Sequence, residues 1–354
     1  MPLKTKSLNF EGQVFHVGID VHKKSWKVKV RSNHSVIKSL SVDPSPEVLS
    51  KTLNNLYPHA IFNTVYEAGF SGYWAHRQFK DLGIKNIVVN PADIPTSNKE
   101  RDRKSDPIDC GKLSRELENG SLSGIYIPSE EKEGLRSISR LLHQNRKRST
   151  QVKNRIKSYL HFTGVTIKVH HESSHWSKAF LQLLQSIRFS TEYHQYTFNC
   201  YLEELLRCRK DRLKILRKIR SICVENKTIQ MLRTIPGIGP IIAFVLYTEL
   251  IDIVRFSSFD RLASYVGLVP STQGSGEKLI VKGLTARHAR YLRYLLVESA
   301  WHSVRKDPVM SLSFLNYSKR MPKQKAIIRI AKKLLSRIRY VWKNNTTYEI
   351  GIIE

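Results

Sequence analysis

The chain has 354 residues, with 59 lysines and arginines against 30 aspartates and glutamates, and a formal net charge of +29. That length is enough for two or three domains with substantial cores. So large a cationic excess indicates a polyanionic partner, most simply nucleic acid, with an anionic membrane surface as the alternative. Because the sequence has no bilayer-length apolar run and no signal-peptide core at its start, we expect a cytoplasmic protein that faces nucleic acid.

Metal-binding and redox cysteine motifs are not supported. The four cysteines, at positions 110, 200, 208 and 223, form no Cys-x-x-Cys pair, so we interpret them as reduced thiols. Residues 171–175 read His-Glu-Ser-Ser-His and match a zinc metalloprotease pattern. Their polar, serine-rich flanks lack the apolar helical stripe that such a site needs, and a polar tip with exposed histidines is the preferred interpretation.

The predicted elements begin with an apolar strand over residues 14–21, in which Asp20 is the one acid. A carboxylate buried alone costs stability, so Asp20 is either a turn residue at the strand exit or a metal ligand with partners elsewhere. Two further strands are predicted over 26–30 and 34–40, and the first of them alternates with period two. A helix follows, with Pro46 at its first position.

Three further acids stand where they could join Asp20. Glu67 lies near the end of a β-branched strand over 64–68. Asp106 and Asp109 stand three residues apart at a helix start, a spacing that places both carboxylates on one face. Hard oxygen ligands suit Mg²⁺ or Mn²⁺, and two such ions clamp a phosphodiester for in-line displacement. The acids therefore predict a metal site built from two strand ends and one helix face.

A helix over 72–82, a strand over 86–90 and the helix with Asp109, which ends near 118, complete the first part of the chain. This alternation predicts an α/β sheet with helices on its faces. The stretch 120–129 is rich in Gly, Ser and Pro and marks a domain boundary. We expect three domains, over residues 1–125, 126–226 and 227–354.

Two long helical patterns, over 130–162 and about 195–225, flank an insert over 163–194. They predict an antiparallel helical arm of coiled-coil type. Residues 205–220 contain eight basic residues against one acid. A basic helix face is usually only solvated, but with this net charge we favour contact with a nucleic-acid backbone. The candidate contacts on the first helix are Arg146, Lys147 and Arg148.

The last third, mainly helical, begins with a helix-hairpin-helix-like pattern over 231–243. Gly237 and Gly239 there permit close approach of a phosphate to the backbone, although an ordinary helical turn would look similar. After a helix over 259–266, a glycine-rich loop carries Ser275 between two glycines. Its hydroxyl would be unobstructed, but no histidine is adjacent to activate it, so Ser275 is either a nucleophile or a plain loop residue.

Two basic helices complete the prediction. The first, over 285–304, has arginines at three-residue spacing that suits phosphates, namely Arg287, Arg290 and Arg293. The second, over 323–343, lies within a stretch of ten Lys or Arg residues and no acid. Such a helix can dock on a membrane, but with the other basic surfaces we prefer a nucleic acid. Its predicted buried face consists of Ile327, Ala331, Leu334, Ile338 and Val341.

Six short motifs follow one another along the chain. They are Gly18-Ile-Asp-Val-His-Lys-Lys24, Tyr66-Glu-Ala-Gly69, Asn90-Pro, Asp106-x-x-Asp109, Ile235-Pro-Gly-Ile-Gly-Pro240 and Gly267-Leu-Val-Pro…Gly-Ser-Gly-x-Lys278. In this order they resemble the DEDD transposases of bacterial insertion sequences, the family numbered one-ten with its eleven-eleven subgroup. The resemblance covers about residues 13–305, and the ordered set is specific although each motif alone is weak.

The resemblance implies a RuvC-like RNase H fold for the N-terminal domain, with the four acids named above binding Mg²⁺ or Mn²⁺. It also implies a C-terminal transposase domain whose serine, Ser275 here, attacks DNA and forms a 5′-phosphoserine intermediate. Many relatives have two serines before the glycine, whereas Gly274 stands here, so Ser271 is the fallback. Lys278 of the same motif is a further candidate nucleic-acid contact.

The resemblance also implies partners. These are the double-stranded DNA of element ends and target, a structured bridge RNA that pairs with both, and a homodimer or homotetramer with composite active sites. The location implied is the bacterial cytoplasm, associated with the nucleoid and without membrane contact. Two other classes stay open: a RuvC-like metal-only endonuclease or junction resolvase, which would not need Ser275, and a non-enzymatic nucleic-acid scaffold, which would not need the acids.

Overall fold

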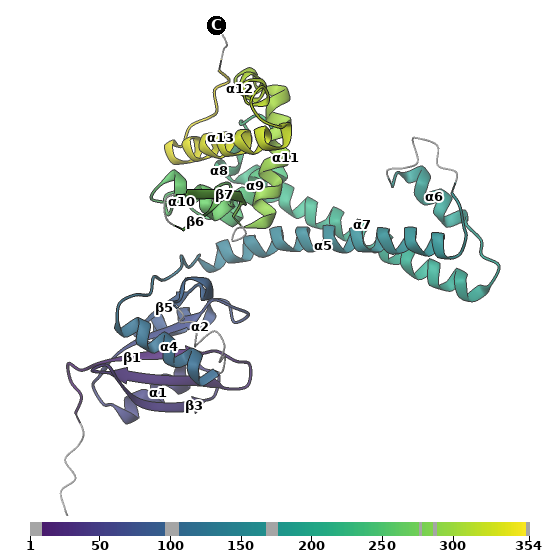
Figure 1. Cartoon of the computed structure of the whole chain (residues 1–354). Helices are drawn as coiled ribbons and strands as arrows, with labels where there is room; N and C mark the ends of the chain where they lie inside the picture. The colour runs from purple at the N-terminus through teal and green to yellow at the C-terminus, as the bar shows by residue number, and fades with distance from the viewer. Residues whose placement is uncertain (1–8, 96–105, 168–175, 276–277, 286–288, 352–354) are drawn as a thin grey trace, which may run out of the picture. The chain divides into compact units, whose positions relative to one another are not determined.

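The computed structural model describes residues 9–95, 106–167, 176–275, 278–285 and 289–351 (Figure 1). The side chains of 106–108 and 272–282 fall outside the description as well. The chain divides into two compact units, Met1–Ile127 and Pro128–Glu354, which are treated separately below. In the described part of the chain, no helix is both long and apolar enough to cross a membrane.

The first unit is built on a five-stranded mixed sheet with the order β3-β2-β1-β4-β5. The strands are β1 (Val14–Asp20), β2 (Trp26–Ser32), β3 (Ser35–Val42), β4 (Ile61–Glu67) and β5 (Lys85–Val89). The meander β1–β3 is antiparallel, whereas β4 runs parallel to both β1 and β5. The predicted α/β architecture is confirmed, and each strand lies close to its expected position.

Helices cover both faces of this sheet. They are α1 (Pro46–Leu56), α2 (Trp74–Asp81), the 3-10 turn Pro91–Asp93 and α4 (Asp106–Glu118). Leu49 of α1 and Phe79 of α2 share a buried cluster with Val17 of β1. Leu113 of α4 instead packs with Val65 of β4. Because neighbouring strand residues point to opposite faces, α1 and α2 lie on one side of the sheet and α4 on the other.

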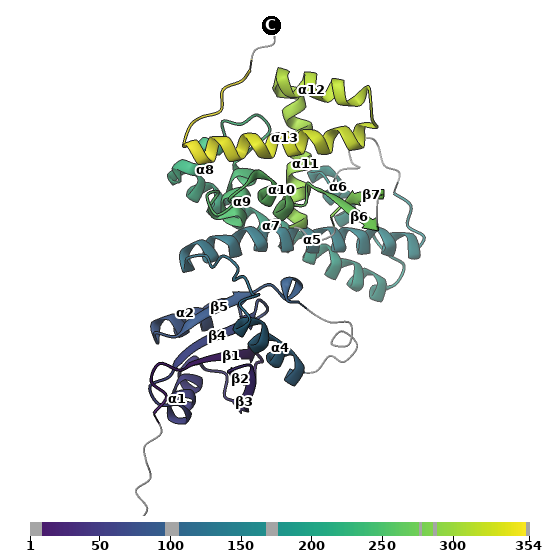
Figure 2. The same ribbon diagram turned by 60° about the vertical axis from the view of Figure 1, so that its left-hand side comes forward.

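The second unit begins with a helical arm, visible in Figures 1 and 2 as two long helices side by side. Its helices are α5 (Glu130–Phe162), α6 (Lys178–Ser186) and α7 (Glu192–Glu225). Asn145 Nδ2 donates to the Cys208 carbonyl, and the Tyr159 hydroxyl lies 2.8 Å from His194 Nδ1. Since later α5 residues meet earlier α7 residues, the helices are antiparallel, as predicted.

The remaining helices surround one large core. They are α8 (Lys227–Leu232), α9 (Pro240–Leu250), α10 (Phe259–Val266), α11 (Arg290–Lys306), α12 (Pro308–Ser318) and α13 (Lys323–Asn344). Helix α9 is apolar almost all round, which is typical of a central buried helix, and it lies in this core. The predicted buried face of α13 is confirmed, since all five of its residues are at most 3% exposed.

Several expectations for the second unit were wrong or incomplete. The predicted glycine-rich loop instead forms an antiparallel hairpin of β6 (Pro270–Ser275) and β7 (Lys278–Leu284). The polar sequence of β6 has no apolar alternation, so it gave no strand signal. Helix α11 begins at Arg290 rather than at 285, and the insert contains α6. The His-Glu-Ser-Ser-His segment, 171–175, lies outside the described residues.

Candidate catalytic and nucleic-acid site

Asp20 and Glu67 end two neighbouring parallel strands. In the register of β1 and β4, Ile19 pairs with Tyr66, so the next residue on each strand is one of the two acids. The carboxyl ends of parallel strands meet at the same sheet edge. Asp20 is 22% exposed, and its Oδ2 lies 3.1 Å from Nε2 of His22. The strand register therefore brings two of the four predicted acids to one edge, within reach of solvent.

The start of α4 lies directly against β1, and Gly18 is the reason that it can. A side chain on Gly18 would collide with the carbonyl oxygen of Cys110 and would lie 2.6 Å from the amide nitrogen of Ser114. Asp109 precedes Cys110 on this helix. The Cys110 thiol is buried, which raises its pKa, and it is close enough to Lys29 and Asp20 for both charges to affect that pKa.

Within the described residues, no group of three or more His, Cys, Asp or Glu side chains is placed to hold a metal ion. The side chain of Asp106 lies outside the described part. Carboxylate oxygens are the ligands that Mg²⁺ and Mn²⁺ prefer, so the four acids predicted from the sequence are of a type that suits a hard divalent cation.

Ser275 is the last residue of β6, beside the turn of the β6–β7 hairpin. Its backbone pairs with that of Lys278, whereas Ser271 pairs with Lys282 at the base of the hairpin. Four residues of strand separate the two serines by about 13 Å. Ser271 therefore does not lie at the position of Ser275. The side chains of Ser275 and Lys278 lie outside the described part.

The hairpin between α8 and α9 carries Gly237 and Gly239, and the two glycines differ. Gly237 has φ +89°, and a Cβ there would lie 2.5 Å from the Ser299 carbonyl oxygen. Gly239 caps α9 with φ −81° and has open space around it. A hollow beside this hairpin is also lined by the exposed side chains of Arg233, His302 and Lys306, none of which the sequence predicted as a contact.

The arginine series on α11 is only partly available to a ligand. Nη1 of Arg293 donates to the carbonyl oxygens of Gly267 (3.3 Å) and Thr285 (3.2 Å). Burial, and next the charge of Arg290, lower the pKa of Arg293. These two hydrogen bonds give Arg293 a structural role beside the β6–β7 hairpin, and its contact with phosphate stays a prediction. Arg290 is exposed, and Arg287 lies outside the described residues.

The predicted contacts on the arm, Arg146, Lys147 and Arg148, are all exposed on α5. Arg148 Nε is 3.0 Å from Glu204 of α7, which neutralises part of its charge. The guanidinium carbon of Arg146 lies 4.8 Å from the ring centre of Tyr294 on α11. Neither Tyr294 nor its neighbour Tyr291 was predicted to belong to a site, although two tyrosines three residues apart among arginines are a readable signal.

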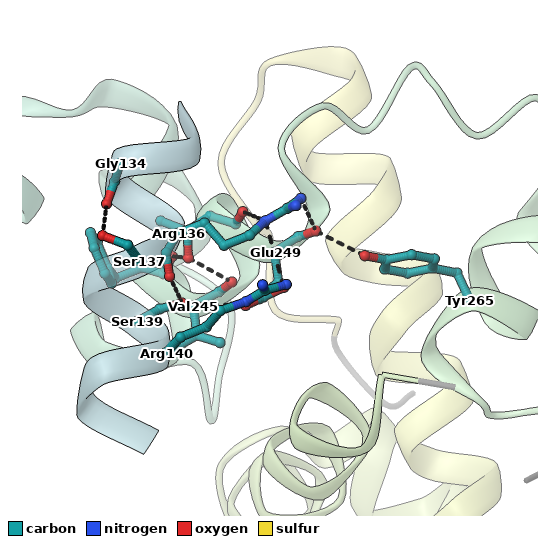
Figure 3. A network of polar contacts seen from close by, with 10 residues as sticks. Gly134, Arg136, Ser137, Ser139, Arg140, Val245, Glu249 and Tyr265 are labelled. Atoms are coloured by element: carbon teal, nitrogen blue, oxygen red, sulfur yellow. Dashed lines mark hydrogen bonds and ion pairs between the residues drawn. The ribbon is translucent and has the colours of Figure 1, made fainter. Parts of the chain in front are cut away.

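A buried ionic network fixes the base of the arm to the C-terminal helices (Figure 3). Arg136 of α5 donates to the carbonyl oxygens of Thr248 (3.2 Å) and Glu249 (3.3 Å) at the end of α9. Arg140 Nε lies 3.2 Å from Glu249 Oε1. The Tyr265 hydroxyl of α10 donates to the Glu249 carbonyl. The network therefore fixes the first part of α5 against the end of α9, which Tyr265 joins to α10.

Comparison with known proteins matches both parts of the chain. A family model described as a transposase of the DEDD IS110 type matches residues 17–164. A second, described as transposase IS116/IS110/IS902 family, matches residues 229–314. The chain therefore belongs to the IS110 family of transposases, enzymes that bind, cut and rejoin DNA.

Individual relatives are similar over most of their length. The chain is 28% identical to a Sinorhizobium fredii protein named "Putative transposase y4qE", over 80% of this chain and 70% of the relative. It is 29% identical to "Putative transposase y4rJ" of the same organism, over 77% and 74%. It is 24% identical to the transposase for insertion sequence element IS1111A of Coxiella burnetii, over 80% and 78%.

Proposed function

We propose that this transposase excises and inserts its own insertion sequence, with Ser275 as nucleophile and Asp20, Glu67, Asp106 and Asp109 as ligands of Mg²⁺ or Mn²⁺. The main support is the pairing register of β1 and β4. It places Asp20 and Glu67 at the ends of neighbouring strands, and β1 packs against the start of α4. The sheet order β3-β2-β1-β4-β5, with α4 on one face, supports a RuvC-like RNase H fold for the same part.

In the proposed reaction, the Ser275 oxygen bonds to a DNA phosphorus while the bond from that phosphorus to the 3′ oxygen breaks. The serine gives up its proton and the 3′ oxygen gains one, which leaves the strand attached through a 5′-phosphoserine. A 3′ hydroxyl of another strand then attacks the phosphoserine, and Ser275 recovers its hydroxyl. Asp20, Glu67, Asp106 and Asp109 would hold a divalent ion, which would supply charge stabilisation for the phosphoryl transfer.

The rest of the chain holds nucleic acid in this account. We assign residues 1–125 to the metal-binding domain, 126–226 to the arm and 227–354 to the domain with the serine. A bridge RNA selects donor and target by base pairing, while exposed cations hold the backbones. Leu141 and Leu213 are half exposed on the arm, which supports self-association into a homodimer or homotetramer with composite active sites.

Paired substitutions test these roles. Asp20→Asn and Ser275→Ala are each expected to reduce strand exchange by roughly a hundredfold or more, with binding of DNA and RNA retained. Asp81→Asn, at an exposed carboxylate that ends α2, is the matched control and should exchange strands normally. Strand exchange that persists in Ser275→Ala would contradict the role of the serine.

The alternative is a metal-only nuclease, which the missing histidine beside Ser275 in the sequence favours. It would use a water molecule as nucleophile and would leave no covalent adduct. In that case Ser275→Ala cuts DNA normally while Asp20→Asn does not. Indifference to both substitutions would instead indicate a scaffold that only binds nucleic acid.

A further inference from the structure

A hollow lies between α5 and α11 in the second unit, away from both the acids and the β6–β7 hairpin in sequence. One wall is a single face of α5, with His143, Arg146 and Lys147 at three- and four-residue spacing. The opposite wall is made by Tyr291 and Tyr294 of α11. Its volume is about 390 Å³, within the range of roughly 300–1,000 Å³ that is typical of small-molecule sites. We call it the α5–α11 hollow.

The walls of the α5–α11 hollow offer flat rings beside positive charge. The His143 and Tyr291 rings lie 4.0 Å apart, centre to centre, at 33°. The Tyr294 side chain is 42% exposed, and its hydroxyl accepts a hydrogen bond from Arg146 Nη2 at 2.5 Å. Arg146 and Lys147 are both exposed. A partly exposed aromatic side chain therefore stands next to Lys147 and next to Arg146, whose guanidinium carbon lies 4.8 Å from the Tyr294 ring centre.

His143 adds a polar group without adding charge. Burial, then the charges of Lys147 and Arg146, lower the pKa of its imidazole, so it is neutral at pH 7. Its Nδ1 is buried and has no hydrogen-bond partner among the described residues. A buried polar atom without a partner costs stability.

We propose that the α5–α11 hollow binds one unpaired nucleotide of a DNA or RNA strand, with its phosphate on Arg146 and Lys147 and its base against Tyr294. Duplex DNA presents phosphates but keeps its base faces stacked inside, whereas an unpaired nucleotide presents both a phosphate and a ring face. The inference rests on the proposed function, because strand exchange and RNA pairing both expose unpaired nucleotides.

The test measures equilibrium binding in the presence of a metal chelator, so that no strand is cut. Labelled single-stranded DNA, single-stranded RNA and duplex DNA are titrated with the full-length protein. Tyr294→Leu should weaken binding of at least one single strand by roughly five- to a hundredfold and leave duplex affinity within about twofold. Tyr196→Leu, which removes an exposed tyrosine from the start of α7, is the matched control and should change neither.

Two more variants separate stacking from charge and from fold. Tyr294→Phe keeps the ring, so it should bind single strands like the wild type. Lys147→Gln should weaken single-strand and duplex binding together and should lower the slope of log affinity against log salt by about one. A single strand with the fluorescent base 2-aminopurine should lose emission on the wild type and keep it on Tyr294→Leu.

Equal losses of single-strand and duplex affinity in Tyr294→Leu, or no loss at all, would overturn the proposal. So would Tyr294→Phe binding as poorly as Tyr294→Leu, because the hydroxyl rather than the ring would then matter. Since these affinities are measured without cleavage, failure of the serine mechanism would leave them unchanged, and the two proposals can fail independently.

Discussion

At the residue scale, Gly237 and Gly239 show what a motif leaves undecided. The sequence assigns both to one role, the close approach of a phosphate. In the structure Gly237 has φ +89° and faces the α11 backbone, whereas Gly239 has an ordinary φ and open space. Glycine is thus required at 237 because of its positive φ and its close approach to α11, whereas the structure does not require it at 239.

Substitution of the two glycines should separate packing from binding. Gly237→Ala is expected to lower the free energy of unfolding by about 2–4 kcal/mol, because it adds left-handed strain and a clash with Ser299. Gly239→Ala should change it by less than about 1 kcal/mol and mainly affect DNA binding. Urea unfolding followed by circular dichroism measures both. Equal stability of the two variants would contradict this reading of Gly237.

Side-chain chemistry alone singled out the four acids and the exposed cations of α5 as candidates, and their roles stay predictions. The residues that it could not sort were those whose role depends on distant backbone. The spacing of Arg293 predicts a phosphate contact, whereas in the structure its Nη1 donates to the carbonyl oxygens of Gly267 and Thr285. Such acceptors lie far away in sequence, and no local pattern predicts them. A series of arginines at three-residue spacing therefore does not show which of its members make hydrogen bonds within the protein.

At the element scale, strands and helices with strong apolar periodicity were predicted within a few residues. The long helices α5 and α7 and the buried face of α13 are of this kind. The missed elements had weak signals: β6 is polar and glycine-containing, and α12 follows α11 with only Asp307 between them. Pro308 restarts the helix, and Asp307 caps it by accepting from the amide nitrogens of Val309 and Met310.

The joint between α5 and α9 leads to a prediction about the two arginines there. The Arg136 side chain is 10% exposed and Arg140 is 61% exposed. Arg136→Gln should lower the free energy of unfolding by roughly 3–5 kcal/mol, because it leaves Glu249 poorly compensated in a buried site. Arg140→Gln should cost about 1 kcal/mol or less, as exposed ion pairs do. Thermal unfolding compares them, and a larger loss for Arg140→Gln would refute the assigned order.

The segment after α13 is held by Tyr348, whose hydroxyl donates to Asp307 while its amide donates to Thr234 Oγ1 at 2.8 Å. Burial, then the Asp307 hydrogen bond, raise the pKa of Tyr348 to about 12. The folded-state pKa thus exceeds the unfolded value of about 10. The stability from this contact is therefore complete below pH 10 and is lost as pH rises through 12.

Tyr348→Phe should be less stable than the wild type at pH 8, and the gap should narrow as pH rises from 10 to 12. The reason is that only the wild type loses a favourable proton-dependent contact in that interval. Urea midpoints at several pH values measure it, with Tyr340→Phe, an exposed tyrosine on α13, as the control. If the stability difference between the wild type and Tyr348→Phe did not change with pH, the ionisation of this hydroxyl would have no effect on stability, which would contradict the prediction.

At the scale of the whole molecule, the charge of +29 predicted a polyanionic partner, and membership of a DNA-cutting family agrees with that prediction. In the structure, some basic side chains are paired with protein groups, whereas others are exposed and can contact a nucleic acid. Arg148 is paired with Glu204, and Arg136 is bound to the end of α9. Lys147 and Lys306 are exposed. Net charge alone cannot make this distinction, because each pairing depends on tertiary contacts.

If Ser275 itself attacks DNA, the protein becomes covalently attached to a DNA strand during the reaction, and this adduct can be trapped. The protein would be incubated with its element's RNA and labelled donor DNA in Mg²⁺, then denatured, digested and analysed by mass spectrometry. We predict a nucleotide adduct on Ser275, absent from Ser275→Ala and from Asp20→Asn. Cleaved DNA without any adduct, or an adduct on Ser271, would contradict the account.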